Sequence, residues 1–134
     1  MRGKIIYYSE TGHTRSAALL IQQTLGCPLR SVRTLPSIND CSVIIIGSPV
    51  RDEHIHPAMR SYIGTQIWKG KTVYPFITCG GVFLPVFQEI RAVIRGARIT
   101  DDLVIRYGFK GNLLTSPKDI TAWAERIKFR HGTL

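Results

Sequence analysis

Short apolar runs alternate with segments of helical periodicity along most of the chain. Runs rich in β-branched and aromatic residues predict five strands, at residues 4–8, 27–33, 42–47, 72–78 and within 97–108. Between them, apolar residues recur every three or four positions, which predicts helices over 13–25, 57–66, 84–95 and from 117 onward. This alternation of strand and helix predicts an α/β fold with a parallel sheet covered on both faces.

The predicted boundaries agree with local stop and start signals. Gly26 suits the C-cap of the first helix, and Pro57 suits the first turn of the second. Ser116 and Pro117 suit the N-cap and first position of the last helix. The basic tail 128–134 is expected to be frayed. The length of 134 residues predicts one domain spanning 1–134.

The first strand is followed by a polar loop that opens the first helix. This loop consists of Ser9, Glu10, Thr11, Gly12, His13 and Thr14. Hydroxyl groups, backbone N–H groups and the positive end of a helix dipole converge there, so an anion such as a terminal phosphate is the expected ligand. An ordinary capped turn remains the structural alternative.

The segment Ser9-x-Thr11-Gly12-x-Thr14 resembles the phosphate loop of flavodoxins. The resemblance implies a flavodoxin-like three-layer α/β/α sandwich with a five-stranded parallel sheet in the order 2-1-3-4-5. It also implies FMN as cofactor, bound at the switch point between the first and third strands. The phosphate is then expected on the loop Ser9–Thr14.

The same resemblance implies that two further loops border the flavin ring. The first contains Ser48, Pro49, Val50 and Arg51, and the second contains Thr78, Cys79, Gly80, Gly81 and Val82. Arg51-Asp52 stands where many flavodoxins carry a ring-stacking aromatic residue, and an arginine can also lie flat on a ring. Cys79 is expected to be a small buried thiol near the ring.

The segment Arg51-x-x-His54-x-His56 is similar to one in flavodoxin-like protoporphyrinogen oxidases, which are basic and pass electrons to quinones. A tyrosine common in that motif is Asp52 here. The His-x-His spacing also occurs in zinc sites, but the sequence places no further ligands, so no metal is expected. Two partly exposed loop histidines are the simplest interpretation.

Charge and cysteine content bear on partners and on location. The 18 Lys and Arg against 9 Asp and Glu give a net charge of +9, whereas electron-carrying flavodoxins are usually acidic. A basic surface favours an acidic partner or an anionic membrane surface. The charges are scattered singly, which argues against a nucleic-acid groove.

Three irregularly spaced cysteines argue against a disulfide framework and predict a reducing cytoplasm. No apolar run is long enough for a transmembrane segment.

Two functions therefore remain open from the sequence. The first is an FMN-binding redox protein that transfers electrons to a partner protein or a quinone-like small molecule, either as a carrier or as an oxidoreductase. The second is a flavodoxin-fold binding module that has lost FMN and uses its basic surface for a partner. The intact loop at Gly12 favours the first, and Arg51-Asp52 favours the second.

Overall fold

The computed structural model describes residues 2–81 and 83–134. The strands are β1 (Gly3–Tyr7), β2 (Leu29–Ser31), β3 (Val43–Arg51), β4 (His54–Ile55), β5 (Thr72–Cys79), β6 (Arg98–Ile99) and β7 (Leu103–Arg106). The helices are α1 (His13–Leu25), α2 (Pro57–Gly64), α3 (Leu84–Val93) and α4 (Pro117–His131), with a 3₁₀ turn η1 at Val32–Thr34.

The main sheet is parallel and follows the order β2-β1-β3-β5, with β6 and β7 both paired to β5 on its outer side. This confirms the predicted order 2-1-3-4-5, with the fifth strand split in two. The interruption at residues 100–102 faces Tyr74 and Pro75 of β5. Pro75 has no backbone N–H to donate, which disfavours continuous pairing there.

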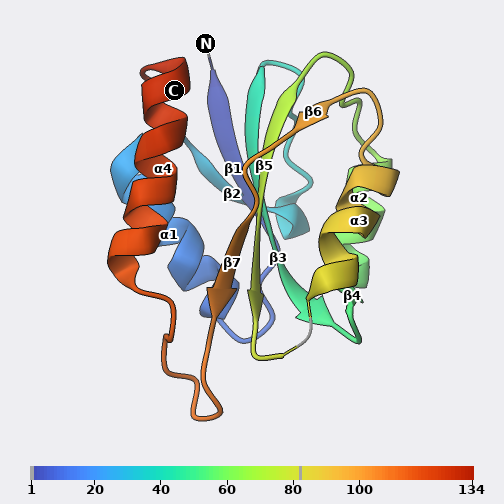
Figure 1. Cartoon of the computed structure of the whole chain (residues 1–134). Helices are drawn as coiled ribbons and strands as arrows, with labels where there is room; N and C mark the ends of the chain where they lie inside the picture. The colour runs from blue at the N-terminus through green and yellow to red at the C-terminus, as the bar shows by residue number, and fades with distance from the viewer. Residues whose placement is uncertain (1, 82) are drawn as a thin grey trace.

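Helices cover both faces of the sheet, with α1 and α4 on one side and α2 and α3 on the other (Figure 1). Successive residues of β3 enter opposite cores: Val43 and Ile45 pack toward α1 and α4, and Ile44 and Ile46 pack toward the other face. This is why the run is apolar at every position. Gly47 follows, where an added Cβ would lie 2.0 Å from Cζ of Phe76, so that the aromatic ring requires a glycine.

Several predicted boundaries differ from the structure. Strand β2 spans only Leu29–Ser31, because the chain turns into η1 at Val32. The tail predicted to be frayed is helical as far as His131 in α4. The helices predicted to end at residues 66 and 95 end at Gly64 and Val93.

The largest difference concerns Ser48–Arg51, for which the sequence predicts a loop. In the structure these residues continue β3, and Val50 and Arg51 form an antiparallel hairpin with β4, in which Arg51 pairs with His54. Asp52 and Glu53 form the two-residue turn with φ of 51° and 66°. Positive φ at both central residues is the backbone of a type I′ turn, which matches the twist of a hairpin.

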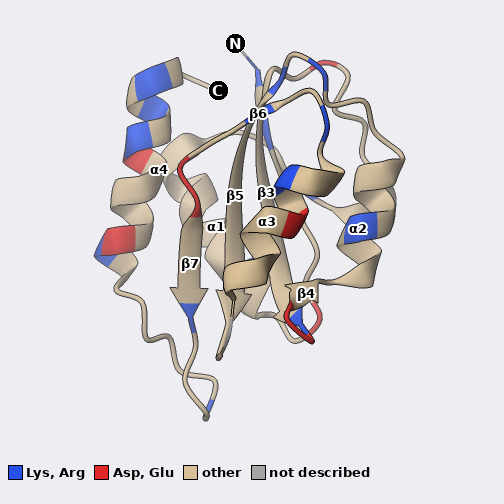
Figure 2. Cartoon of the chain, turned by 45° about the vertical axis from the view of Figure 1, so that its right-hand side comes forward, with Lys and Arg blue, Asp and Glu red and all other residues tan. Residues whose placement is uncertain are grey.

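Charge is distributed unevenly between the two ends of the sheet. Lys and Arg gather toward the end at which the strands begin, while the β3–β4 hairpin at the other end carries both signs (Figure 2). Among the described residues, no helix combines the length and the apolar character that crossing a bilayer would need.

Candidate functional site

A cleft of about 280 Å³ opens at the carboxyl ends of the central strands. It is lined by the β1–α1 loop, by the end of β3, by the end of β5 and by the residues after β7. Its lining residues are Glu10, Thr11, His13, Thr14, Pro49, Val50, Thr78, Cys79, Gly80, Tyr107 and Gly108. All three segments that the sequence predicted to converge therefore meet at one cleft, which lies at the switch point of the sheet.

The loop Ser9–Thr14 is built around the start of α1. Gly12 is the N-cap and has φ of 97°, a conformation that favours glycine. Ser9 Oγ accepts hydrogen bonds from the N–H groups of Gly12 and Arg15, at 3.1 and 3.2 Å. Since the first-turn N–H groups of a helix have no partner within it, further donors there are available to an anion.

A buried hydroxyl pair joins this loop to the end of β5. Thr14 Oγ1 lies 2.7 Å from Thr78 Oγ1, and the two residues are 1% and 4% exposed. One hydroxyl donates to the other, so each of these two buried polar groups has a hydrogen-bond partner. The position of α1 relative to β5 is thereby held by a polar contact at the site itself.

The β3–β4 hairpin is held to α2 by a chain of hydrogen bonds. The His56 N–H donates to Ser48 Oγ at 3.1 Å, and the Ser48 hydroxyl donates to the Pro49 carbonyl at 2.9 Å. His56 is also the N-cap of α2, because its Nδ1 accepts the Ala58 N–H at 3.0 Å. Ser48 is 3% exposed and supports the hairpin from beneath, while Pro49 and Val50 line the cleft.

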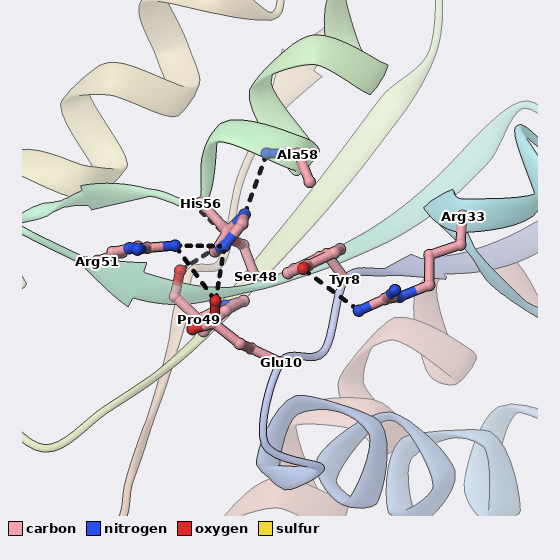
Figure 3. Close-up of polar contacts among 8 residues, drawn as sticks. All are labelled: Tyr8, Glu10, Arg33, Ser48, Pro49, Arg51, His56 and Ala58. Atoms are coloured by element: carbon pink, nitrogen blue, oxygen red, sulfur yellow. Dashed lines mark hydrogen bonds and ion pairs between the residues drawn. The ribbon is translucent and has the colours of Figure 1, made fainter.

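Glu10 bridges the loop and the hairpin (Figure 3). Its Oε2 lies 3.2 Å from Arg51 Nη1 and 3.1 Å from His56 Nε2. Because His56 Nδ1 already accepts a hydrogen bond, the proton of the neutral ring is on Nε2 and is donated to Glu10. The Tyr8 ring stacks on His56 at a centroid distance of 4.2 Å, and its hydroxyl accepts from Arg33.

The fourth wall of the cleft comes from the segment after β7, which the sequence interpretation did not assign to the site. The Tyr107 ring stacks on His13 at 4.1 Å between centroids, and its hydroxyl donates to the His13 carbonyl at 3.1 Å. Its N–H donates to the Cys79 carbonyl. Tyr107 and Gly108 directly follow the carboxyl end of β7. Because ligands of such folds bind at the carboxyl ends of the strands, this position in the sequence could have assigned both residues to the site.

Burial raises the pKa of the Cys79 thiol, while the nearby Arg106 acts in the opposite direction. Burial likewise raises the pKa of the Tyr107 hydroxyl. Both groups therefore remain protonated and uncharged near neutral pH, which suits the wall of a ligand cleft better than nucleophilic chemistry.

The structure places most of the predicted site residues together. Nine of them line the cleft, as named above. Ser9 and Gly12 shape its first loop, Ser48 lies beneath the hairpin, and Gly81 follows Gly80 as an exposed residue. Arg51 faces Glu10 instead of lining the cleft, and Val82 lies outside the described residues.

The family model of the flavodoxin domain matches residues 4–82, more than half of the chain. The chain belongs to the flavodoxin family. The matched segment includes all three predicted loops of the flavodoxin site, from Ser9 to Val82. No curated protein matches the chain.

Solved flavodoxin structures share the whole fold at low identity. Flavodoxin 1 from Bacillus cereus is 15% identical, with a TM-score of 0.74 and 100% of both chains covered. A flavodoxin from Fusobacterium nucleatum, bound to flavin mononucleotide, is 14% identical, with a TM-score of 0.74 and coverage of 96% of this chain and 98% of that one. A Lactobacillus acidophilus flavoprotein in complex with FMN is 17% identical, with a TM-score of 0.62 and coverage of 78% and 92%.

The residues of this flavodoxin-family cleft fit a phosphorylated flat ligand. Backbone donors at the start of α1 and the Thr11 hydroxyl suit a phosphate. Pro49 and Val50 add apolar side chains to the lining, and Gly80 leaves its backbone exposed there. An apolar slot with a few placed polar groups is the usual construction of a cofactor site.

Proposed function

We propose that the chain binds FMN in this cleft and transfers electrons through it. The observation that carries the proposal is the convergence of three strand-end segments on a cleft at the start of α1. Membership of the flavodoxin family supports it, as do the FMN complexes of structural neighbours. FMN supplies one- and two-electron chemistry, and the protein supplies binding, orientation and local charge.

The residues divide into a phosphate end and a ring end. N–H groups of the first turn of α1, with the hydroxyls of Ser9, Thr11 and Thr14, would hold the phosphate. The segments Pro49–Val50 and Cys79–Gly81, with Val82 next to them in the sequence, would border the ring. Tyr107 would close the side formed by the β7–α4 segment, since its ring already stacks on His13.

The partner is proposed to be a redox protein or a quinone-like small molecule, in a reducing cytoplasm. Three free cysteines among the described residues support that compartment. The similarity of Arg51–His56 to flavodoxin-like protoporphyrinogen oxidases supports a quinone-dependent enzyme as one form of the proposal. The second candidate, a binding module without FMN, is supported by the absence of an aromatic residue at Arg51-Asp52.

Absorption spectra and FMN titration of the apoprotein test the proposal. Purified protein is expected to show flavin bands that dithionite bleaches, and the apoprotein is expected to quench FMN fluorescence on binding. Thr11→Ala should weaken FMN binding about tenfold or more, as loss of a hydrogen bond to a charged group does. Thr133→Ala, an exposed threonine beyond α4, is the matched control. A colourless protein whose apo form leaves FMN fluorescence unchanged would favour the binding module.

A further inference from the structure

Arg51 lies outside the lining of the cleft in which FMN binding is proposed. Its guanidinium group contacts Glu10, and the residue borders a separate cavity of about 540 Å³ on the outer side of the hairpin, with Ile55, Pro57 and Arg60. The cofactor cleft is lined instead by the two preceding residues of the strand, Pro49 and Val50. Arg51 therefore contacts a residue of the cleft lining, Glu10, without lining the cleft itself.

Glu10 lies in the loop where the phosphate is proposed to bind, although its charge has the same sign as a phosphate. It lies two residues before the N-cap Gly12, and the start of a helix attracts carboxylates as well as phosphates. An unrestrained Glu10 side chain could accept hydrogen bonds from the same N–H groups that would bind the phosphate. It would then both compete with FMN and repel it.

Two donors hold this carboxylate, one on the hairpin and one at the N-cap of α2. Arg51 Nη1 and the Nε2–H of His56 both donate to Oε2 of Glu10 (Figure 3). His56 is 7% exposed and is fixed by its bonds to Ser48 and Ala58 and by the Tyr8 ring. It therefore presents its one proton in a set direction, and Arg51 adds the compensating charge.

We infer that Arg51 and His56 are positioning residues that hold the Glu10 carboxylate on the hairpin and so keep the helix N-terminus free for the FMN phosphate. This inference rests on the proposed FMN binding. It assigns Arg51 a role at the phosphate end of the site, in place of ring stacking.

A double-mutant cycle in FMN affinity tests the inference. Arg51 is more than half exposed, so Arg51→Ala is expected to fold. Arg51→Ala should weaken FMN binding about tenfold, which is within the range of interaction energies found between side chains in contact. Glu10→Gln should bind FMN as well as the wild type or more tightly, since the competing charge is gone. The double variant Arg51→Ala/Glu10→Gln should match Glu10→Gln within about twofold.

Other roles of Arg51 give different patterns. If Arg51 stacks on the ring, Arg51→Ala weakens binding equally in the wild type and in the Glu10→Gln variant, which overturns the inference. If the Glu10–Arg51 ion pair serves only to attach the hairpin to the loop, Glu10→Gln weakens FMN binding as much as Arg51→Ala does. That result also overturns the inference. Arg30→Ala removes one exposed positive charge that contacts neither Glu10 nor its partners, and it should leave FMN affinity unchanged. A wild-type protein that does not bind FMN would instead reject the proposed function.

Discussion

At the scale of single residues, polar side chains decide how the cleft is held open. The Thr14–Thr78 hydroxyl pair joins two segments that converge at the site, and the Glu10 carboxylate joins the first loop to Arg51 and His56. The Ser9 hydroxyl accepts from two N–H groups of its own loop and the first turn of α1. Only the first of these is fully buried. Because a buried hydroxyl without a partner loses its hydration with no compensation, this pair is the most sensitive of the three.

Removal of one of these two hydroxyls should destabilise the apoprotein. Thr14→Val or Thr78→Val leaves the other hydroxyl buried without its partner, which is expected to lower the free energy of unfolding by about 1–3 kcal/mol. The double variant Thr14→Val/Thr78→Val should lose less than the sum of the single losses, because no orphaned hydroxyl remains. Urea unfolding of the four proteins measures this, and strictly additive losses would show that the hydroxyls are not coupled.

At the scale of elements, the connection between β6 and β7 ties α4 to the sheet. The Asp101 carbonyl accepts the Trp123 indole N–H, and its carboxylate accepts from Arg126 and Arg130 at 3.0–3.2 Å. The hydrogen bond from Arg126 is the main cause that lowers the Asp101 pKa, with Arg130 adding to it. Asp101 has φ of 55°, which Asn also tolerates, so the charge can be removed with little backbone effect.

Asp101→Asn should therefore reduce stability in a pH-dependent manner. The lowered pKa of Asp101 in the folded state stabilises the protein at pH values above the unfolded value of about 3.9. This contribution is lost as the pH falls through the folded value. The variant should be less stable than the wild type by about 1 kcal/mol at pH 7, since the arginines are exposed, and the difference should vanish toward pH 2.

Urea unfolding at neutral and acid pH is the measurement. Asp52→Asn is the matched control, because Asp52 also has positive φ but lies in the hairpin turn. A stability difference for Asp101→Asn that persists unchanged at pH 2 would assign the loss to something other than the ion pairs.

At the scale of the whole molecule, the parallel sheet separates the cleft at its carboxyl end from a basic end. Arg2, Lys69, Arg95 and Arg98 lie near the amino ends of the strands, and Lys128 lies in the last turn of α4 at that same end. All five are exposed. Among the ion pairs between described residues, only one involves any of these five, Arg2 with Asp40 at 3.7 Å. An anionic surface could therefore contact this end while the cleft stays open at the other (Figure 2).

Binding to anionic vesicles is the expected consequence of this charge distribution. Vesicles of phosphatidylglycerol and phosphatidylcholine should co-sediment with the protein at low salt and release it at high salt. Lys69→Glu/Arg98→Glu should weaken this binding by about tenfold or more, given roughly 1 kcal/mol for each basic residue near a charged membrane. Arg33→Glu/Lys110→Glu makes the same charge change at the cleft end and should have a smaller effect. Equal losses for the two pairs would indicate that only net charge matters.

Features that depend on neighbouring residues were predictable from the sequence, whereas contacts between distant residues were not. The loop at Gly12, the run at β3 and the caps of α1 and α4 were predictable because each depends on neighbouring residues. The β3–β4 hairpin was not, because a two-residue strand is too short for periodicity and Asp52-Glu53 is not a typical hairpin turn. The direction in which Arg51 points depends on Glu10, 41 residues earlier, and no local pattern contains that contact.

The sequence by itself determined the alternation of strands and helices, the family and the three segments that meet at the switch point, because periodicity, capping and motif spacing are local properties of a chain. Only the tertiary structure decided that Tyr107 closes the cleft, that Thr14 pairs with Thr78 and that Arg51 faces Glu10. These contacts depend on how distant strand ends align once both faces of the sheet are packed, because packing sets the distances over which side chains can bond.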